Sequence, residues 1–437
     1  MEVKPFKAFR FDAGVVGDVG SCIAPPYDVI SPAQQEQLYQ KSKYNIVRII
    51  KGKTTASDNS GNNQYTRAAD YLNTWIEKGV LKQDSAEAIY AYLQDFKLAG
   101  AQFQRTSFIA LARLEEFGET LRPHEETLEE PKIDRLNLKR ATVAKLGLVF
   151  MLYEDEEMVA DKIIENVATE KPLIDCCDDQ NVRHRLFAIT NEENIRTIAK
   201  MMLGKKCIIA DGHHRYETAL NYYKETGNPA AGYQMTGFVN ACHGGLIILA
   251  THRLVGNIQD FRFEKLITDL KENFEITEYK FEQDPQAKTD AKKKMLVQMK
   301  AEYESDKNAF GIYSGNNAFY VAVLKSKQAM DPIVPNMSAA WKVLDVSVLH
   351  KLVLEKLLGI GAEQLAAGSS IEYIKDTDNA IDESIAKVNG EQKQVAFFMN
   401  PVKMNQLKMV TNVGEKMPQK STYFYPKMYT GLAIQKL

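Results

Sequence analysis

The chain has 437 residues, of which 45% are hydrophobic and 26% are charged. This composition is typical of globular proteins and excludes a disordered tail protein. At roughly 150 residues per domain, the length predicts about three domains. Lysine and arginine total 55 against 57 aspartates and glutamates, so the formal net charge is -2. The chain therefore lacks the basic excess that a non-specific nucleic-acid binder needs to displace counterions.

The cysteines and the N-terminal segment indicate a cytoplasmic protein. Five cysteines occur without any Cys-x-x-Cys spacing, which argues against a zinc ribbon or a disulfide framework and predicts reduced thiols. The opening segment MEVKPFKAFRFDAG lacks the apolar core and small-residue cleavage site of a signal peptide. No run approaches the ~18 apolar residues of a membrane-spanning helix. We expect no membrane partner.

The first half of the chain alternates helical and strand patterns. Ser31-Pro32 resembles a helix start, and it predicts a helix over 33–42 followed by a strand over 45–52. The pattern then predicts the elements that follow: a helix over 65–78, paired strands at 88–96 and 103–117, a buried strand over 148–153, a strand over 207–210, a helix over 216–227 and a strand over 246–255.

After about residue 256 lysine-rich amphipathic segments alternate with apolar strands. The spacing predicts strands over 308–314 and 318–325 and a helix over 344–361, whereas 414–437 resembles a loop. We therefore predict an α/β fold of α+β character whose sheet is mixed rather than all parallel. Residues 1–256 would form an N-terminal α/β region, and residues 257–437 a C-terminal α/β region whose last loop returns to the site.

The strongest local signal is the turn Asp211-Gly212-His213-His214-Arg215, which lies between a short apolar strand and a helix. Glycine lets the backbone approach a ligand, and the N–H groups and dipole of the following helix attract an anion such as phosphate. Arg215 can clamp that anion, the histidines can move protons, and Asp211 can bind Mg²⁺ or orient a hydroxyl. Together these groups suit phosphoryl transfer, where catalysis is mainly positioning and charge neutralisation.

A structural interpretation of this turn stays open. In it, His213 and His214 cap backbone groups and Arg215 pairs with an acidic residue. A transition-metal site is disfavoured, because adjacent histidines point in different directions and no His-x-x-x-His or His-x-His spacing occurs. We predict no metal-ligating cluster of protein side chains.

Two further segments carry candidate site residues. His124 beside Glu125 is a proton-transfer pair, although a charged helix start explains the same spacing. Lys420 and Ser421 are candidates to close over a phosphate group from the C-terminal segment. A Walker A loop, a Gly-x-Gly-x-x-Gly motif and a Gly-x-Ser-x-Gly motif are all absent from the sequence.

Six sequence blocks, in order along nearly the whole chain, resemble one bacterial and archaeal family, the domain-of-unknown-function family one-zero-one-five. They are APPYDVIS, RPHEETLEEPKIDRLNLKRAT, DGHHRYETAL, GLIILATHRL, LDVSVLHKLVLEKLLG and MPQKSTYFYPK. The turn also resembles the phosphate-gripping turn of the ParB/sulfiredoxin superfamily, and it is similar to the Asp-Gly-His-X-Arg turn of free-serine kinases.

The resemblance implies a ParB/sulfiredoxin-like phosphate-binding core with large additions. It places substrate and phosphoryl-transfer roles on Asp211 and His213, with phosphate held by Gly212 and Arg215. The family's connection with serine biosynthesis makes serine or phosphoserine the expected substrate of a kinase or phosphatase. Mg²⁺ is then the expected companion of any nucleotide, with ADP or ATP as candidates.

Two alternatives from other functional classes remain. One is a nucleotide-binding, ParB-like regulatory or DNA-associated module without metabolic turnover, and the other is a metabolite-binding protein. The first requires a basic DNA-binding element such as a helix-turn-helix, which the charge pattern does not show.

Overall fold

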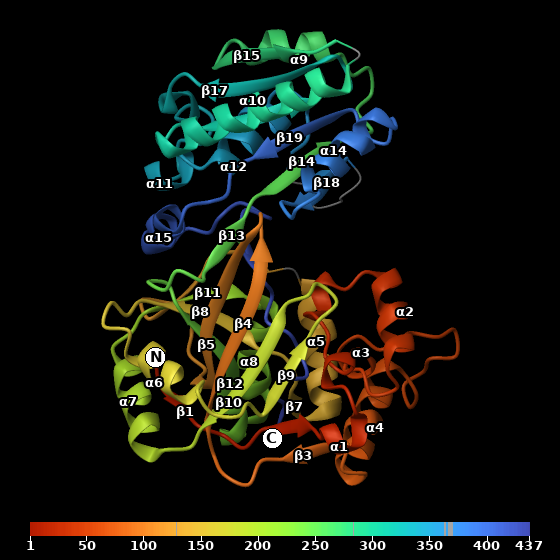
Figure 1. Cartoon of the computed structure of the whole chain (residues 1–437), viewed down its shortest axis with the longest axis vertical. Coiled ribbons are helices and arrows are strands. Elements are labelled where there is room, and N and C mark those ends of the chain that lie inside the picture. The colour runs from red at the N-terminus through yellow and green to blue at the C-terminus, as the bar shows by residue number, and fades with distance from the viewer. Residues whose placement is uncertain (128, 283, 362–363, 366–369) are drawn as a thin grey trace. The chain divides into compact units, whose positions relative to one another are not determined.

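A computed structural model describes residues 1–127, 129–282, 284–361, 364–365 and 370–437 (Figure 1). The chain forms two compact units. The first comprises Met1–Ile247 together with Pro426–Leu437, and the second comprises Ile248–Tyr425. The last residues of the chain therefore belong to the first unit, although the whole second unit precedes them in sequence.

The first unit combines strands with short and medium-length helices. Its strands are β1 (Val3–Lys4), β2 (Phe9–Phe11), β3 (Leu81–Gln83), β4 (Ile89–Leu98), β5 (Ala101–Arg113), β6 (Leu121–Pro123), β7 (Ala144–Lys145), β8 (Val149–Tyr153), β9 (Ile174–Cys177), β10 (Arg183–Ile189), β11 (Cys207–Asp211), β12 (Tyr233–Asn240) and β21 (Gln435–Lys436). Its helices are α1 (Ala13–Val16), η1 (Val19–Ser21), η2 (Tyr27–Val29), α2 (Pro32–Lys41), α3 (Val47–Ile50), α4 (Gln64–Glu77), α5 (Glu129–Thr142), α6 (Val159–Val167), α7 (Glu192–Leu203), α8 (His213–Thr226) and η3 (Pro229–Gly232).

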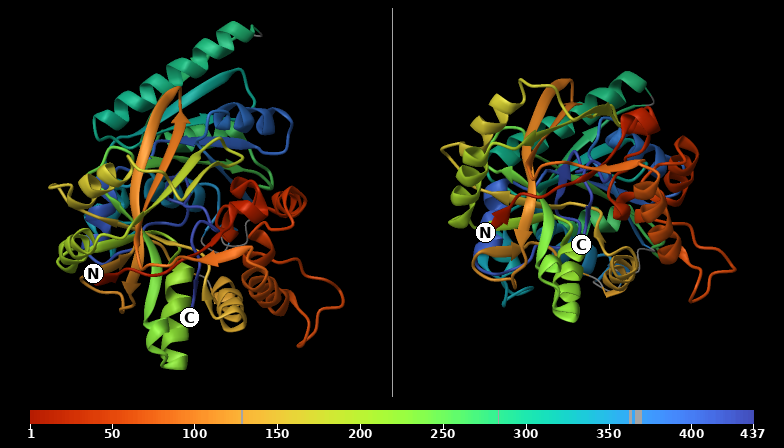
Figure 2. Two further views of the ribbon diagram at one scale, coloured as in Figure 1. Left: turned by 60° about the horizontal axis from the view of Figure 1, so that its bottom comes forward. Right: turned by 90° about the horizontal axis from the view of Figure 1, so that it is seen from below.

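Over the described residues, a nine-stranded sheet forms the centre of the first unit. Its order is β6-β11-β8-β12-β5-β4-β10-β9, and β1 adds to β5. The pairs β11–β6 and β12–β8 are parallel, whereas the other pairs are antiparallel. The long β4–β5 hairpin turns at Ala99 and Gly100, both of which have positive φ, and it is conspicuous in Figures 1 and 2. The predicted mixed α/β class is confirmed.

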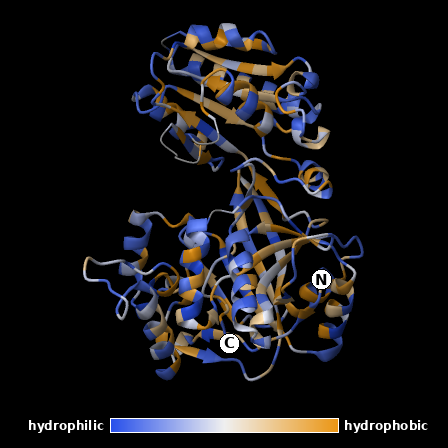
Figure 3. Cartoon of the chain, turned by 180° about the vertical axis from the view of Figure 1, so that it is seen from behind, coloured by the Kyte–Doolittle hydropathy of each residue, from blue (hydrophilic) through white to orange (hydrophobic). Residues whose placement is uncertain are grey.

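Two apolar clusters stabilise the first unit. One packs residues of the large sheet against α6, α7 and α8 and includes Phe108, Met151 and Tyr216. The other joins α2, α3 and α4 around Trp75. Figure 1 shows α6 and α7 on one flank of the sheet and α2–α4 on the opposite flank, and Figure 3 shows apolar residues along the strands. The turn that ends β11 therefore lies on a packed framework.

The structure corrects two strand predictions. Within the predicted strand over 45–52, Val47–Ile50 form the helical turn α3 and no strand is present. The side chain of Asn45 accepts a hydrogen bond from the Val47 N–H, and the apolar residues of the turn pack into the Trp75 cluster. A short apolar run has no periodicity that separates a buried strand from a buried helix, so tertiary packing decided. The predicted strand over 246–255 is divided at Ala250 into β13 (Ile247–Leu249) and β14 (Thr251–Val255).

The second unit has its own sheet. Its strands besides β14 are β15 (Phe274–Lys280), β16 (Ala309–Tyr313), β17 (Ala318–Leu324), β18 (Ile371–Lys375), β19 (Val395–Met399) and β20 (Tyr423–Tyr425). Its helices include α9 (Phe263–Leu270), α10 (Pro285–Glu304), η4 (Lys327–Met330), α11 (Ala339–Lys342), α12 (Asp345–Val348), the π-helix η5 (Leu349–Glu355), α14 (Ala380–Asn389) and α15 (Met404–Asn412). The antiparallel order is β15-β17-β16-β19-β14-β18.

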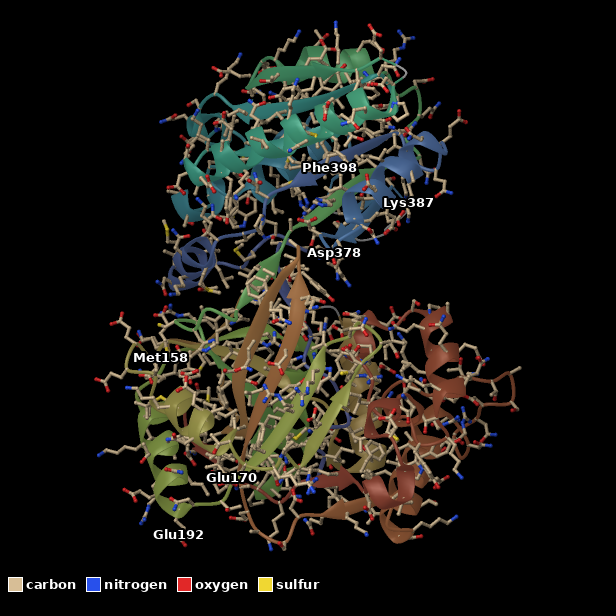
Figure 4. All side chains as sticks on the ribbon, in the orientation of Figure 1. Met158, Glu170, Glu192, Asp378, Lys387 and Phe398 are labelled. Atoms are coloured by element: carbon tan, nitrogen blue, oxygen red, sulfur yellow. The ribbon has the colours of Figure 1, made fainter. Side chains whose placement is uncertain are left out.

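Packing in the second unit follows the apolar pattern of the sequence. Phe398 on β19 is buried in its core, whereas Lys387 on α14 forms an ion pair with Glu372; Phe398 and Lys387 are labelled in Figure 4. The predicted strands over 308–314 and 318–325 are confirmed as β16 and β17. The predicted helix over 344–361 is present as α12 and η5, where a π-helical segment replaces regular α-helix.

Replacing Gly245 by alanine should destabilise the first unit by about 2 kcal/mol or more. A Cβ at this position would lie 1.9 Å from the backbone oxygen of Gln104, which cannot move without disturbing the β4–β5 hairpin. Chemical denaturation of the purified variant measures the change. Gly244→Ala is the matched control, because a Cβ there meets nothing within 4 Å. Equal stabilities of the two variants would contradict the close approach.

Candidate functional site

The predicted turn joins β11 directly to α8. Gly212 adopts φ 89°, a left-handed conformation, and its backbone oxygen accepts the first helical hydrogen bond, from the Tyr216 N–H. An added Cβ would lie 3.0–3.2 Å from guanidinium atoms of Arg215. Glycine therefore serves two purposes here, because it permits the turn and lets the Arg215 side chain fold back across it.

Asp211 lies between two cations. One carboxylate oxygen is 2.5 Å from Nη2 of Arg215, and the other is 2.5 Å from Nζ of Lys427. All three side chains are largely buried. Burial alone raises the pKa of Asp211, but the positive charges of Lys427 and Arg215 outweigh burial and hold that pKa well below its ordinary value. Asp211 therefore stays ionised and is a weak proton acceptor.

Two buried histidines meet beside this carboxylate. The Nε2 atom of His213 accepts a hydrogen bond from the backbone N–H of His124 at 3.2 Å, and the two rings are 4.7 Å apart in an edge-on arrangement. Nδ1 of His124 donates to the backbone oxygen of Ile209 at 2.5 Å. Burial lowers the pKa of both imidazoles, that of His213 strongly, so both rings are neutral at pH 7. These hydrogen bonds place the proton of the neutral His124 ring on Nδ1 and leave Nε2 of His213 without one.

The half-buried His214 faces the acidic side of the site. Burial lowers the pKa of His214, and the nearby carboxylates of Asp28, Glu217 and Glu125 oppose that shift. Glu125 also lies 4.0 Å from Nε2 of His124. His214 and Glu125 are thus ionisable groups with access to solvent, unlike the buried pair His124 and His213.

A cavity of about 70 Å³ lies beside Arg215. Four basic side chains contribute to its wall, and no aspartate or glutamate of the described residues does. Its lining residues are Tyr27, Ile50, Arg135, Leu138, Lys139, Ala144, Lys145, Leu146, Gly147, Arg215, Thr218, Gln234 and Thr430. Arg215 thus lies between the Asp211 turn and a cationic cavity.

The structure brings most of the predicted site residues together. Asp211, Gly212, His213 and Arg215 form one cluster with His124, and electrostatic contacts join His214 and Glu125 to it. Two of these contacts are the ones expected if the turn has only a structural role: His213 caps the backbone N–H of His124, and Arg215 pairs with an acidic residue, Asp211. The adjoining cationic cavity is the additional feature that a purely structural turn does not require.

Lys420 and Ser421 belong to the second unit. The Ser421 hydroxyl is buried and donates to the backbone oxygen of Pro418, and the backbone oxygen of Lys420 accepts from Arg253 at 2.9 Å. A role for these two residues in closing over a phosphate group stays a prediction.

Sequence reasoning missed four residues that the structure places at this site. Lys427 directly follows a proline in a segment predicted as loop, and nothing local links it to Asp211. Arg135 and Lys139 are four residues apart on α5, which places them on one helix face and is a detectable signal. The position of Lys145 in β7 could not be predicted from sequence periodicity, because its environment depends on the pairing of β7 with β21.

A family model described as "Protein of unknown function (DUF1015)" matches residues 3–347. The chain belongs to this family. No curated protein matches this DUF1015 member. No group of three or more histidine, cysteine or carboxylate side chains within the described ranges is placed to hold a metal ion. In the same residues no helix has the length and apolar character that crossing a membrane requires.

Several solved structures are similar to this DUF1015 member. A free serine kinase in complex with AMP shares 12% identity over 71% of this chain and 89% of that chain, with a TM-score of 0.34. SbnI with a C-terminal truncation, from Staphylococcus aureus, shares 10% identity over 75% of this chain and 87% of its own, also with a TM-score of 0.34. A conserved hypothetical protein from Pyrococcus furiosus shares 12% identity over 72% and 94%, with a TM-score of 0.31. At these low values the chain's own residues carry the functional argument.

Proposed function

We propose that this DUF1015 member is a phosphoryl-transfer enzyme acting on a small hydroxylated metabolite, with serine or phosphoserine as the best candidate. The observation that carries the proposal is the geometry of the Asp211 turn. An ionised carboxylate between Arg215 and Lys427 stands at the start of α8, beside two neutral imidazoles.

The transferred phosphoryl group is placed at the N-terminus of α8. Gly212 carries no side chain that caps the first turn, so the helix dipole and first-turn N–H groups favour an anion there. Arg215 and Lys427 add two positive charges whose positions Asp211 fixes. Fixed cations of this kind stabilise the charge that develops on the equatorial oxygens during phosphoryl transfer.

The acid–base role falls on His214 or Glu125 rather than on Asp211. A group that accepts a proton from a substrate hydroxyl works best with a pKa near the operating pH, and Asp211 is held far below that range. His214 is half-buried and lies near carboxylates, which suits proton exchange with solvent. Asp211 then acts as a positioning residue for the two cations, and neutral His213 orients the backbone at His124.

The acidic surroundings of His214 suit a substrate that carries an ammonium group. Asp28, Glu125 and Glu217 give this side of the site a negative field, whereas Arg215 and Lys427 attract phosphate. A phosphorylated amino acid has both charges, and the resemblance of the turn to that of free-serine kinases supports serine. Mg²⁺ would be held there by phosphate oxygens, water and one or two carboxylates, with ADP or ATP as nucleotide.

The test is incubation of the purified protein with phosphoserine and Mg²⁺, with and without ADP. We expect release of free serine, accompanied by ATP if ADP is the acceptor and by inorganic phosphate if water is the acceptor. The reverse reaction, serine with ATP, completes the assay. Binding of CTP or DNA without turnover in any direction would replace the enzyme by the ParB-like alternative.

A further inference from the structure

The cationic cavity contains two lysines that lack acidic partners. Lys139 and Lys145 are only 8% and 1% exposed. Nζ of Lys145 donates to the backbone oxygen of Ala230 at 3.0 Å, and Nζ of Lys139 lies 5.7 Å from the ring centre of Tyr222. Within the described residues neither ammonium group forms an ion pair.

Keeping such groups charged inside a protein is unfavourable. Transfer of an unpaired ammonium group from water to a protein interior is costly, so buried lysines are normally paired or lose their proton. Burial accordingly lowers the pKa of Lys145 to about 6 and that of Lys139 to about 8. A hydrophobic side chain would pack at either position without this penalty, so a ligand that supplies the negative charge accounts for both lysines.

Both lysines line the cavity together with the guanidinium groups of Arg135 and Arg215. Arg135 stacks on Tyr27, with 3.8 Å between the guanidinium carbon and the ring centre. The Nε atom of Arg215 is buried and has no hydrogen-bond partner in the described residues. Because Arg215 also lines the cavity, an oxygen anion bound there would supply an acceptor for this donor.

We infer that the cavity binds a phosphate or pyrophosphate group, held by Lys139 and Lys145 with Arg135 and Arg215. This anion site shares Arg215 with the phosphoryl position at the start of α8 but is otherwise formed by different residues, and it requires no turnover. Two ligands offer the same chemistry: inorganic pyrophosphate, and the diphosphate of a nucleotide whose remaining atoms contact apolar wall residues such as Ile50 and Leu146.

Binding of an anion here should be coupled to proton uptake. An anion favours the charged form of both lysines, so their pKa values rise above about 6 and about 8 on binding, and protons are taken up at neutral and mildly alkaline pH. Other charged or titratable groups face these lysines as well: Lys4 on β1, Arg215 on α8, Arg135 on α5 and Tyr27 on η2. Burial lowers the pKa of Arg215, but the carboxylate of Asp211 outweighs burial and raises it, and burial raises the pKa of Tyr27 to about 12, so the lysines dominate the uptake.

Isothermal titration of the full chain with inorganic pyrophosphate, ADP and AMP at pH 7.5 tests the inference. Titration in two buffers of different ionisation enthalpy gives the number of protons taken up. We expect Lys139→Met and Lys145→Met each to weaken pyrophosphate or ADP binding by about 10-fold or more and to reduce proton uptake, as loss of a charge-assisted hydrogen bond implies. Lys162→Met is the control, because Lys162 is exposed on α6.

The outcomes separate the two ligand sources and the two proposals. Tight binding of pyrophosphate itself assigns the site to the inorganic ion, whereas tight binding of ADP with weak binding of pyrophosphate assigns it to a nucleotide. Unchanged affinity in both lysine variants, or no binding of either ligand, overturns the inference. Asp211→Asn should abolish turnover and retain anion binding in the cavity. Anion binding can therefore be tested even if the enzyme proposal fails.

Discussion

Arg215→Ala should lower phosphoryl transfer by at least ~100-fold while the protein stays folded. The variant loses the guanidinium group that spans the Asp211 turn and the cavity, and with it a fixed charge that stabilises the transferring phosphoryl group. The fold should persist because Lys427 still neutralises Asp211. Steady-state turnover of phosphoserine measures the effect, and circular dichroism reports the fold.

Arg140→Ala is the matched control for this variant. Arg140 is also an arginine of the first unit, but it forms an exposed ion pair with Glu225 and does not line the cavity. Its removal should leave turnover within about two-fold, as expected for a surface pair. Activity of Arg215→Ala within a few-fold of the unmodified protein would remove Arg215 from the site.

Lys145→Met should stabilise the protein at neutral pH and reduce the pH dependence of its stability. Burial lowers the pKa of Lys145 from 10.5 to about 6 in the folded state. Between these values the unfolded chain holds a proton that the folded chain lacks, so the free energy of unfolding rises with pH by about 1.4 kcal/mol per unit. At pH 7.5 folding must remove the proton of Lys145, which costs on the order of 4 kcal/mol, and methionine removes this cost.

Urea unfolding of both proteins at several pH values between 6 and 9 measures this difference. The stability gap should be largest at the acidic end and should narrow as pH rises. Lys162→Met, an exposed substitution, should change neither the stability nor its pH dependence. A destabilised Lys145→Met with an unchanged pH slope would show that the Lys145 amine already has a compensating partner.

Much of the fold was predictable because periodicity reports burial. The apolar runs that became β8, β16 and β17 are buried on both faces, the run that became β11 is mostly buried, and the helical spacing over 65–78 became α4. The failure at residues 45–52 arose because four apolar residues pack equally well in a strand or a helical turn. The order of the strands in the sheet could not be predicted, because the pairing of β12 with β8 joins segments that are far apart in sequence.

Part of the candidate site was likewise predictable from the sequence, and part was not. The Asp211 turn was visible because polar residues and a glycine directly follow an apolar strand, and the partners of Asp211 within that turn are local. Lys427 was not visible, since its contact with Asp211 spans 216 positions of the chain. The sequence analysis did not single out Lys139 or Lys145, because burial of a basic residue leaves no local pattern in a single sequence.

The return of the C-terminal segment to the first unit has a consequence for biosynthesis. Residues Pro426–Leu437 supply Lys427, and they pair β21 with β7. A ribosome must translate every residue of Ile248–Tyr425 before Lys427 emerges. Until then Arg215 is the one of these two cations that is available to Asp211, so a polypeptide that ends before Lys427 lacks the second positive charge. Synthesis of Ile248–Tyr425 must therefore precede assembly of the Asp211 site.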